Sequence, residues 1–241
     1  MLRHSDWGEA DRLITLYTRE QGKLRANAKG ARRMRSRKAG HLEPFTRVAL
    51  QLAHGRDMWI ITQAETVEAY LPLRDDLVRT GYAAYVLELL DRFTYEEGEN
   101  RALYQLVIQT LPLIAAETDV VPAVRYYEVR LLDLLGFRPQ LFECVRCGKE
   151  IQAQDQFFSM EQGGVVCPEC SALNGELRAV SMSALKYLRH LQRSNFPAVQ
   201  RAGIPAAIRP ELEALLQSYL TYLLERGLNS PAFLRAVQKK P

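Results

Sequence analysis

The stretch Arg19–Arg47, REQGKLRANAKGARRMRSRKAGHLEPFTR, concentrates the positive charge of this 241-residue chain. It holds ten Lys and Arg residues against only Glu20 and Glu43, a net charge of +8, whereas the whole chain carries +4. The rest of the chain therefore sums to −4. Positive charge gathered in one segment, with strand-like sequence on both sides, is the electrostatic pattern of a surface that binds a polyanion.

The sequence around this stretch predicts a small β barrel. Alternating apolar and polar residues predict four strands, at Arg12–Thr18, Lys23–Lys29, Phe45–Ala53 and Met58–Thr66. In the second strand, Leu24, Ala26 and Ala28 are predicted to face a core, while the alternating basic residues face water or a ligand. The segment Gly30–Gly40 follows as a basic loop. Four or five short antiparallel strands favour an OB-type barrel, a class that frequently binds nucleic acid.

The second part of the chain reads as helices, because its apolar residues recur every three or four positions. The predicted helices begin near Leu77, Leu103, Ala123, Ser181 and Pro210. Pro112 is expected to end or kink the second helix, and Ser181 or Ser183 to cap the fourth. The predicted fold class is therefore α+β. It comprises an OB-type barrel over residues 1–70 and a helical domain over residues 71–241, which contains a cysteine motif at residues 141–172.

Four cysteines form two CxxC pairs. Cys144 and Cys147 make the first pair, Cys167 and Cys170 make the second, and nineteen residues separate them. Each CxxC turn lets two thiolates converge on one ion, so the spacing predicts a tetrahedral zinc site with four sulfur ligands. Redox pairs or incidental thiols are the alternative, but the βαβ setting typical of a redox CxxC is absent from the sequence. A shell filled by four cysteines leaves no position for water, which predicts a structural metal.

The basic segment admits two interpretations. A run of charge is commonly only a solvated surface. A nucleic-acid-binding role is favoured because the run lies between predicted barrel strands and because arginine binds phosphate through forked hydrogen bonds. Tyr17, Phe45 and Trp59 lie on or beside the same strands as candidate base-stacking platforms, although each taken singly is more typical of a barrel core. No base-reading helix is apparent, so binding is expected through backbone charge, with weak sequence preference and steep salt dependence.

The sequence lacks the motifs of several enzyme classes. It contains no GxxxxGK[ST], GxSxG, HExxH or GxGxxG, and its four histidines show no ligand spacing. The carboxylates Glu96, Glu97 and Glu99 resemble a solvated helix end more than a two-metal nuclease site. There is neither a signal-peptide pattern nor an apolar run long enough for a membrane span. These features predict a cytosolic protein that is not an enzyme.

Several segments resemble the bacterial DNA repair family RecO. The opening Gly8–Leu24, GEADRLITLYTREQGKL, carries the resemblance first. It continues through AKGARR at Ala28–Arg33, LEPF at Leu42–Phe45, LELLD at Leu87–Asp91, LLGFRP at Leu134–Pro139 and the four cysteines. The resemblance covers nearly the whole chain. It implies an N-terminal OB fold, a helical C-terminal domain and, in many members, a zinc site in that domain.

The resemblance also implies a role in recombinational repair in the bacterial cytoplasm, at the nucleoid during repair. Such proteins bind single- and double-stranded DNA, anneal complementary strands, and act with RecR to help RecA displace single-strand-binding protein. DNA contact is carried over onto the basic strand and loop, at Lys23, Arg25, Lys29, Arg32, Arg33, Arg35, Arg37 and Lys38. No motif marks the residues that contact RecR or single-strand-binding protein. The alternative function is an RNA- or ribosome-associated structural module, in which barrel and zinc motif clamp folded RNA.

Overall fold

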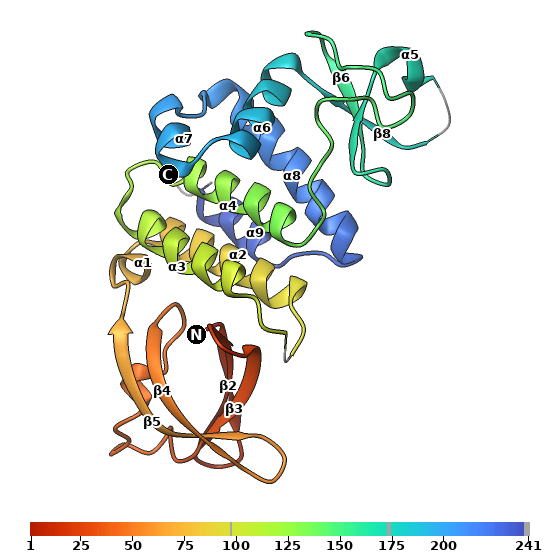
Figure 1. Cartoon of the computed structure of the whole chain (residues 1–241). Coiled ribbons are helices and arrows are strands. Elements are labelled where there is room, and N and C mark those ends of the chain that lie inside the picture. Colours follow the sequence, from red (N-terminus) through yellow and green to blue (C-terminus); the bar gives the residue numbers. More distant parts are fainter. Residues whose placement is uncertain (97, 173–174, 239–241) are drawn as a thin grey trace. The chain divides into compact units, whose positions relative to one another are not determined.

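The computed structural model describes residues 1–96, 98–172 and 175–238 and confirms the α+β class (Figure 1). The chain forms two compact units, one of residues Met1–Glu117 with Leu228–Pro241 and one of Thr118–Gly227. The first unit thus joins the barrel to helices from both ends of the predicted helical region. The division at residues 70 and 71 stays a prediction. Within the described ranges, no helix has both the length and the apolar character that a membrane span requires.

A five-stranded sheet forms the barrel in the first unit. Its strands are β1 (Arg3–Trp7), β2 (Asp11–Thr18), β3 (Gly22–Ala28), β4 (Arg47–His54) and β5 (Trp59–Glu68). Their order is β1-β2-β3-β5-β4, with β3 and β5 parallel and the other pairs antiparallel. No ladder between β1 and β4 occurs in the described residues, so the sheet is the partly open Greek-key barrel of the OB class. The predicted barrel is confirmed.

Two strand predictions differ from the structure. The sequence analysis predicted no strand at Arg3–Trp7, which pairs with β2 along its whole length. It also expected antiparallel pairing throughout, whereas β3 and β5 are parallel. A parallel pair needs a crossover rather than a tight turn. The basic loop and β4, which lie between β3 and β5 in the chain, supply that crossover.

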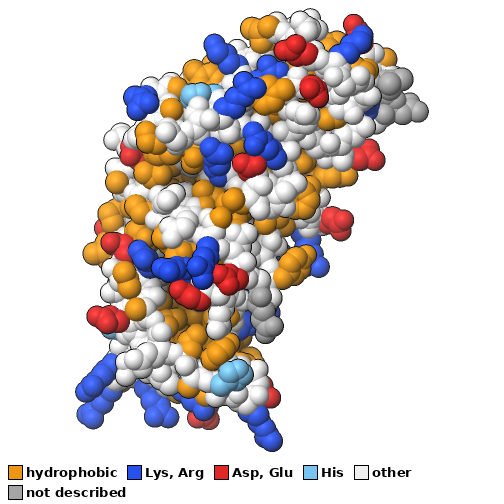
Figure 2. Space-filling model, in the orientation of Figure 1, with side chains coloured by type: hydrophobic (Ala, Val, Ile, Leu, Met, Phe, Trp, Pro, Cys, Tyr) orange, Lys and Arg blue, Asp and Glu red, His pale blue; other side chains and the backbone are white. Residues whose placement is uncertain are grey.

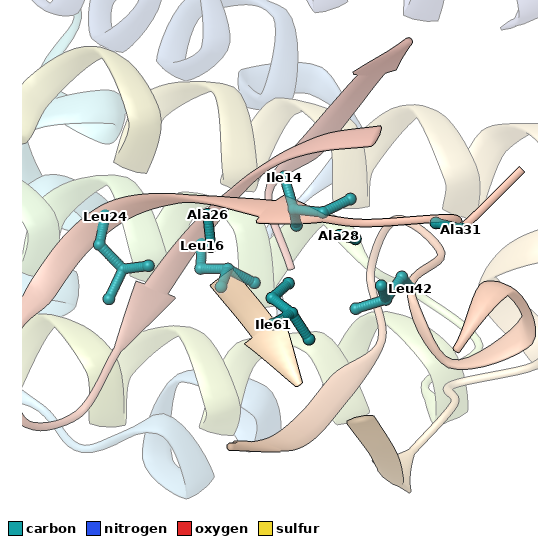
Figure 3. Close-up of a cluster of buried hydrophobic side chains, with 8 residues drawn as sticks. All are labelled: Ile14, Leu16, Leu24, Ala26, Ala28, Ala31, Leu42 and Ile61. Carbon is teal, nitrogen blue, oxygen red and sulfur yellow. The ribbon is translucent and has the colours of Figure 1, made fainter. Parts of the chain in front are cut away.

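The barrel core takes residues from the basic segment as well as from the strands (Figure 3). Leu24, Ala26 and Ala28 of β3 are buried, as their alternation predicted. Ala31 and Leu42, which bracket the basic loop, are also fully or almost fully buried. The complete cluster is Ile14, Leu16, Leu24, Ala26, Ala28, Ala31, Leu42 and Ile61. The loop is therefore tied to the core at both ends, while its middle, apart from the short 3₁₀ turn η1 (Ala39–His41), is irregular.

The remaining elements of the first unit are helices. They are α1 (Pro72–Asp75), α2 (Leu77–Phe93), α3 (Arg101–Ala116) and α9 (Ser230–Gln238). Side chains of Asp76 and Asn100 accept backbone N–H bonds at the starts of α2 and α3. Pro112 lies inside α3 rather than ending it. Helix α9 was not predicted; it packs on α2, where the Glu88 carboxylate accepts the N–H groups of Asn229 and Ser230.

The second unit combines helices with a small sheet. Its helices are α4 (Val121–Leu134), α5 (Pro168–Ser171), α6 (Met182–Arg193), α7 (Phe196–Ala202) and α8 (Arg209–Leu224), with a 3₁₀ turn η2 (Ala206–Ile208). The strands β6 (Gln156–Ser159), β7 (Gly164–Val166) and β8 (Leu177–Val180) form a sheet of order β7-β6-β8. Ser181 caps α6 by accepting the Ala184 N–H, as predicted. The antiparallel β6–β7 hairpin lies between the two cysteine pairs in the chain.

Candidate nucleic-acid interface and metal centre

The start of the basic loop is fixed to the turn between β1 and β2. The carboxylate of Asp11 accepts the backbone N–H of Gly30 at 2.8 Å and the amide of Asn27 at 3.2 Å. The Gly30 hydrogen bond is the main reason that the pKa of Asp11 lies below its usual value. Gly30 adopts a left-handed conformation (φ +66°), which glycine tolerates without strain. The Arg32 N–H then donates to the Ala10 carbonyl at 2.9 Å.

Beyond this anchor, the basic side chains of the loop face solvent. Lys29, Arg32, Arg33, Arg35 and Arg37 are all exposed, and Met34 at their centre is fully exposed. Figure 2 shows Lys and Arg side chains projecting from the barrel end of this view. Among the described residues, no carboxylate lies within ion-pair distance of Lys29, Arg33, Arg35 or Arg37. These four charges are therefore available to an external anion.

Two other residues of the loop are partly engaged within the protein. An Nη atom of Arg32 lies 3.4 Å from an Asp6 carboxylate oxygen, and another donates to the Gly8 carbonyl at 3.4 Å. Both distances are long, so they leave Arg32 able to turn toward a phosphate. Lys38 is half-buried and donates to the Ile61 carbonyl at 2.9 Å. Lys38 thus holds the end of the loop against β5.

The basic residues of β3 have a different environment from those of the loop. The Lys23 ammonium lies 2.6 Å from an Asp91 carboxylate oxygen, and it also donates to the Asp91 and Thr94 carbonyls. Its side chain is only 12% exposed, so Lys23 faces α2 rather than water. Arg25 pairs with Glu96 at 2.6 Å and remains about half exposed. The predicted DNA contacts of Lys23 and Arg25 stay predictions, and each requires breaking an ion pair.

The aromatic residues proposed as stacking platforms do not lie on an open surface. Trp59 packs against the barrel core and against the His54 ring, with 4.4 Å between ring centroids. Tyr17 and Phe45 line a cavity of about 480 Å³ between the barrel and helices α2 and α3. Burial there raises the pKa of Tyr17 to about 12. The sequence analysis missed Trp7, which is 48% exposed at the end of β1.

The four cysteines meet in the second unit. Their Sγ atoms all lie within 4.8 Å of one another, and those of Cys147 and Cys167 are 3.9 Å apart. Tetrahedral zinc with Zn–S bonds of about 2.3 Å requires sulfurs separated by about 3.8 Å. The donor set and its spacing therefore fit a four-sulfur metal site, and the predicted convergence of both pairs is confirmed.

Backbone hydrogen bonds build the knuckle, the pair of CxxC turns at Cys144–Cys147 and Cys167–Cys170 that carries these sulfurs. The Gly148 N–H donates to the Cys144 carbonyl at 2.8 Å, and Gly148 adopts φ +71°, as the tight turn after the first pair requires. Burial opposes ionisation of Cys144. Hydrogen bonds from the backbone N–H groups of Cys167, Cys147 and Arg146 outweigh that effect and lower the pKa of the Cys144 thiol to about 6. A thiolate is the form that binds a metal, so this sulfur is prepared for a cation.

Glu96 and Glu99, the described glutamates of the run after α2, are each engaged in a separate ion pair. Glu96 pairs with Arg25, Glu99 pairs with Arg101 at 2.8 Å, and Glu97 lies outside the described residues. Within the described ranges, the four cysteines are the sole group of three or more His, Cys, Asp or Glu side chains arranged to hold a metal. The structure therefore offers no support for the two-metal nuclease alternative among those residues.

Known proteins match the chain over nearly its full length. The family model described as Recombination protein O N terminal matches residues 1–70, and that described as Recombination protein O C terminal matches residues 74–232. DNA repair protein RecO of Roseiflexus sp. (strain RS-1) is 41% identical over 239 residues, which cover 99% of this chain and 84% of that protein. Proteins of the same name from Pelotomaculum thermopropionicum and Dehalococcoides mccartyi (strain ATCC BAA-2266 / KCTC 15142 / 195) are 36% and 33% identical. They align over 100% and 94% of this chain, and over 93% and 89% of their own lengths. The resemblance found in the sequence is confirmed.

Proposed function

The chain belongs to the RecO family and so has a role in recombinational DNA repair, and we propose that it acts there as a DNA-binding mediator rather than as an enzyme. In this proposal it binds single- and double-stranded DNA and promotes annealing of complementary strands. With RecR, it helps to load RecA onto DNA coated by single-strand-binding protein. The site of action is the bacterial cytoplasm, at the nucleoid.

One observation carries this proposal. Lys29, Arg33, Arg35 and Arg37 are exposed and lack a carboxylate partner among the described residues, although they lie on a loop whose ends are anchored in the barrel core. Like charges held close together repel one another in the free protein, and an anion relieves that repulsion. A DNA backbone supplies a row of such anions. The loop, which includes Arg32 and Lys38, is therefore the principal DNA contact in this proposal, and Arg25 and Lys23 of β3 are secondary contacts.

The same charges explain how annealing is promoted. Two complementary strands repel each other through their phosphates, and each phosphate that binds Lys or Arg loses its share of that repulsion and releases counterions. Arginine forks hold a phosphate through two parallel hydrogen bonds and leave the bases free to pair. The loop thus lowers the barrier to pairing without bond-making chemistry. Its effect weakens as salt rises.

The metal in this proposal is structural zinc at Cys144, Cys147, Cys167 and Cys170. Four thiolates suit zinc, and they fill its preferred tetrahedral shell. Bound zinc holds the two CxxC turns together. Because no ligand position remains for water or substrate, the ion fixes the local fold and takes no part in a reaction.

The proposal is tested by annealing complementary DNA strands coated with single-strand-binding protein. We expect the protein to accelerate pairing at low salt and to lose most of this effect at high salt. Parallel competition with RNA and DNA of one sequence separates DNA repair from the RNA-module alternative, because only RNA offers the 2′-OH. No acceleration, or a clear preference for folded RNA, would overturn the proposal.

A further inference from the structure

Trp7 is an exposed indole at the edge of the basic surface. It is one of two tryptophans in the chain, and 48% of its area is exposed at the end of β1. Indole is largely apolar, so leaving it half in water forgoes the stabilisation that burial would give. The other tryptophan, Trp59, packs against the barrel core. Of the two tryptophans, Trp7 is thus the one whose ring an external ligand can reach.

The register of β1 fixes the direction of the Trp7 side chain. His4 pairs with Ile14 of β2, whose side chain lies in the barrel core. Successive strand residues point to opposite faces, so Arg3, Ser5 and Trp7 share the face turned away from that core. Trp7 itself pairs with Asp11, the residue that anchors the basic loop. Its ring therefore lies on the outer surface of the barrel, beside the loop anchor.

The basic loop is attached to the chain on both sides of Trp7. Arg32 reaches Asp6 and the Gly8 carbonyl, each at 3.4 Å, and its backbone N–H donates to Ala10 at 2.9 Å. The β1–β2 turn and the start of the loop thus form one hydrogen-bonded assembly. In OB folds, oligonucleotides bind on the face of the second and third strands and at the loops that join the first to the second strand and the fourth to the fifth. The ring and the guanidinium groups can therefore contact the same strand of nucleic acid.

We propose that Trp7 is a nucleobase-stacking site for single-stranded DNA whose phosphates lie on the basic loop. This inference rests on the proposed function, since it requires DNA at the loop. Every base offers a π-face, so stacking on Trp7 is independent of sequence. In a duplex the bases are already stacked and paired, and the ring cannot reach a base face. Trp7 thus favours unpaired strands, and completed pairing removes its contact with the product.

The first test makes Trp7 the single tryptophan by the substitution Trp59→Phe in the full-length chain, and its emission is excited selectively at a wavelength at which the tyrosines do not absorb. Oligothymidylate, a duplex of equal length, and inorganic polyphosphate are each titrated, and binding is followed separately by anisotropy or competition. We expect oligothymidylate to quench Trp7 emission, while duplex and polyphosphate bind with little change. Binding of oligothymidylate without quenching overturns the stacking site and leaves DNA binding by the loop intact. Absence of any DNA binding overturns the proposed function as well.

The second test compares two substitutions of Trp7 with a control substitution of another exposed apolar residue. Trp7→Ala should weaken binding of oligothymidylate about 5- to 150-fold, as expected for loss of one stacked base. Duplex binding should change less than twofold. Trp7→Tyr keeps an aromatic ring and should remain within a few-fold of wild type, and Leu71→Ala removes another exposed apolar side chain (60% exposed) as the control. Equal losses for single strand and duplex, or no loss in Trp7→Ala, would contradict the inference.

Discussion

The cysteine cluster and the basic loop are both candidate binding sites, but they are built in opposite ways. The four sulfurs converge within 4.8 Å of one another, and backbone hydrogen bonds fix the turns that carry them. The basic side chains of the loop diverge into solvent, and only its ends are fixed. A convergent site is expected to fail when one ligand is lost. A site made of separate charges is expected to lose part of its affinity with each charge that is removed.

The largest expected effect is therefore on the convergent site. Cys144→Ser removes the buried ligand whose sulfur already accepts backbone N–H groups. Structural zinc stabilises small metal-dependent folds by about 10–16 kcal/mol, so we expect this variant to lose its metal and to unfold the knuckle around β6 and β7. Elemental analysis should give one zinc per wild-type chain and none per variant chain.

A matched control for this variant is Glu169→Gln. It breaks the exposed ion pair with Lys149 but leaves all four sulfurs in place, so its zinc content should match that of wild type. Because the loop and the cysteines belong to different compact units, metal loss should leave binding of a DNA oligonucleotide within about twofold. Retention of zinc by Cys144→Ser would show that the four thiols do not act as one site.

The second largest expected effect is the loss of DNA affinity when the arginines of the basic loop are removed together. Replacing Arg32, Arg33, Arg35 and Arg37 with Ala should weaken binding of single-stranded DNA on the order of 10²–10³-fold at low salt, uniformly across sequences. The slope of log K against log salt should fall by about 3, since each contact on a single strand contributes about 0.7. Titrations at several salt concentrations measure both quantities.

The control for this variant removes four exposed charges elsewhere, at Lys186, Arg201, Arg226 and Arg235. In the described residues none of these four has an ion-pair partner, and their removal changes the net charge by the same amount as the loop variant does. Equal losses of affinity in the two variants would mean that net charge, rather than the loop, attracts DNA.

The same contrast explains how much could be predicted from the sequence. The metal centre follows from the CxxC spacing, because a local turn determines where both sulfurs of a pair point. Four of the five barrel strands, β2 to β5, and Leu24, Ala26 and Ala28 of the core follow from alternation. Alternation does not predict the partners of Lys23 and Arg25, because Asp91 and Glu96 lie about seventy residues further along the chain and meet β3 only in the folded unit.

The exposure of Trp7 and the burial of Tyr17 and Phe45 also could not be predicted from sequence patterns. Trp7 was overlooked because β1 contains too few apolar residues to show alternation, and its pairing with β2 is visible only in the fold. Tyr17 and Phe45 have the right residue type for base stacking, but the fold turns them to the cavity beside α2 and α3. Residue type identified the kind of surface. Tertiary packing determines which of the aromatic side chains on that surface are exposed.

Lys23 tests the distinction between charge in the strand and charge in the loop. Lys23→Met leaves the Asp91 carboxylate, 19% exposed, with the exposed Arg3 guanidinium at 3.1 Å, and it removes the donor of the Asp91 and Thr94 carbonyls. It should therefore lower the free energy of unfolding by about 1–3 kcal/mol. DNA affinity should stay within twofold while the protein is folded. Urea denaturation and DNA titration measure these two results independently.

Arg25→Met is the comparison for Lys23→Met. Its ion pair with Glu96 is about half exposed on both sides, so the loss of unfolding free energy should be below about 1 kcal/mol. If Lys23→Met instead reduces DNA affinity as much as removal of a loop arginine does, the ammonium leaves Asp91 to bind phosphate. The strand and the loop would then form one DNA surface.

The smallest effect discriminates best between convergent and separate sites. Arg35→Ala alone should weaken single-stranded DNA binding only about two- to fivefold and reduce the salt slope by about 0.7. If the loop charges act separately, the free-energy losses of the four single arginine variants add up to that of the fourfold variant. If one substitution removes most of the affinity, the loop folds around DNA into a convergent site, as the cysteines do around a metal. Measuring the four single variants beside the fourfold variant at one salt concentration decides between these outcomes.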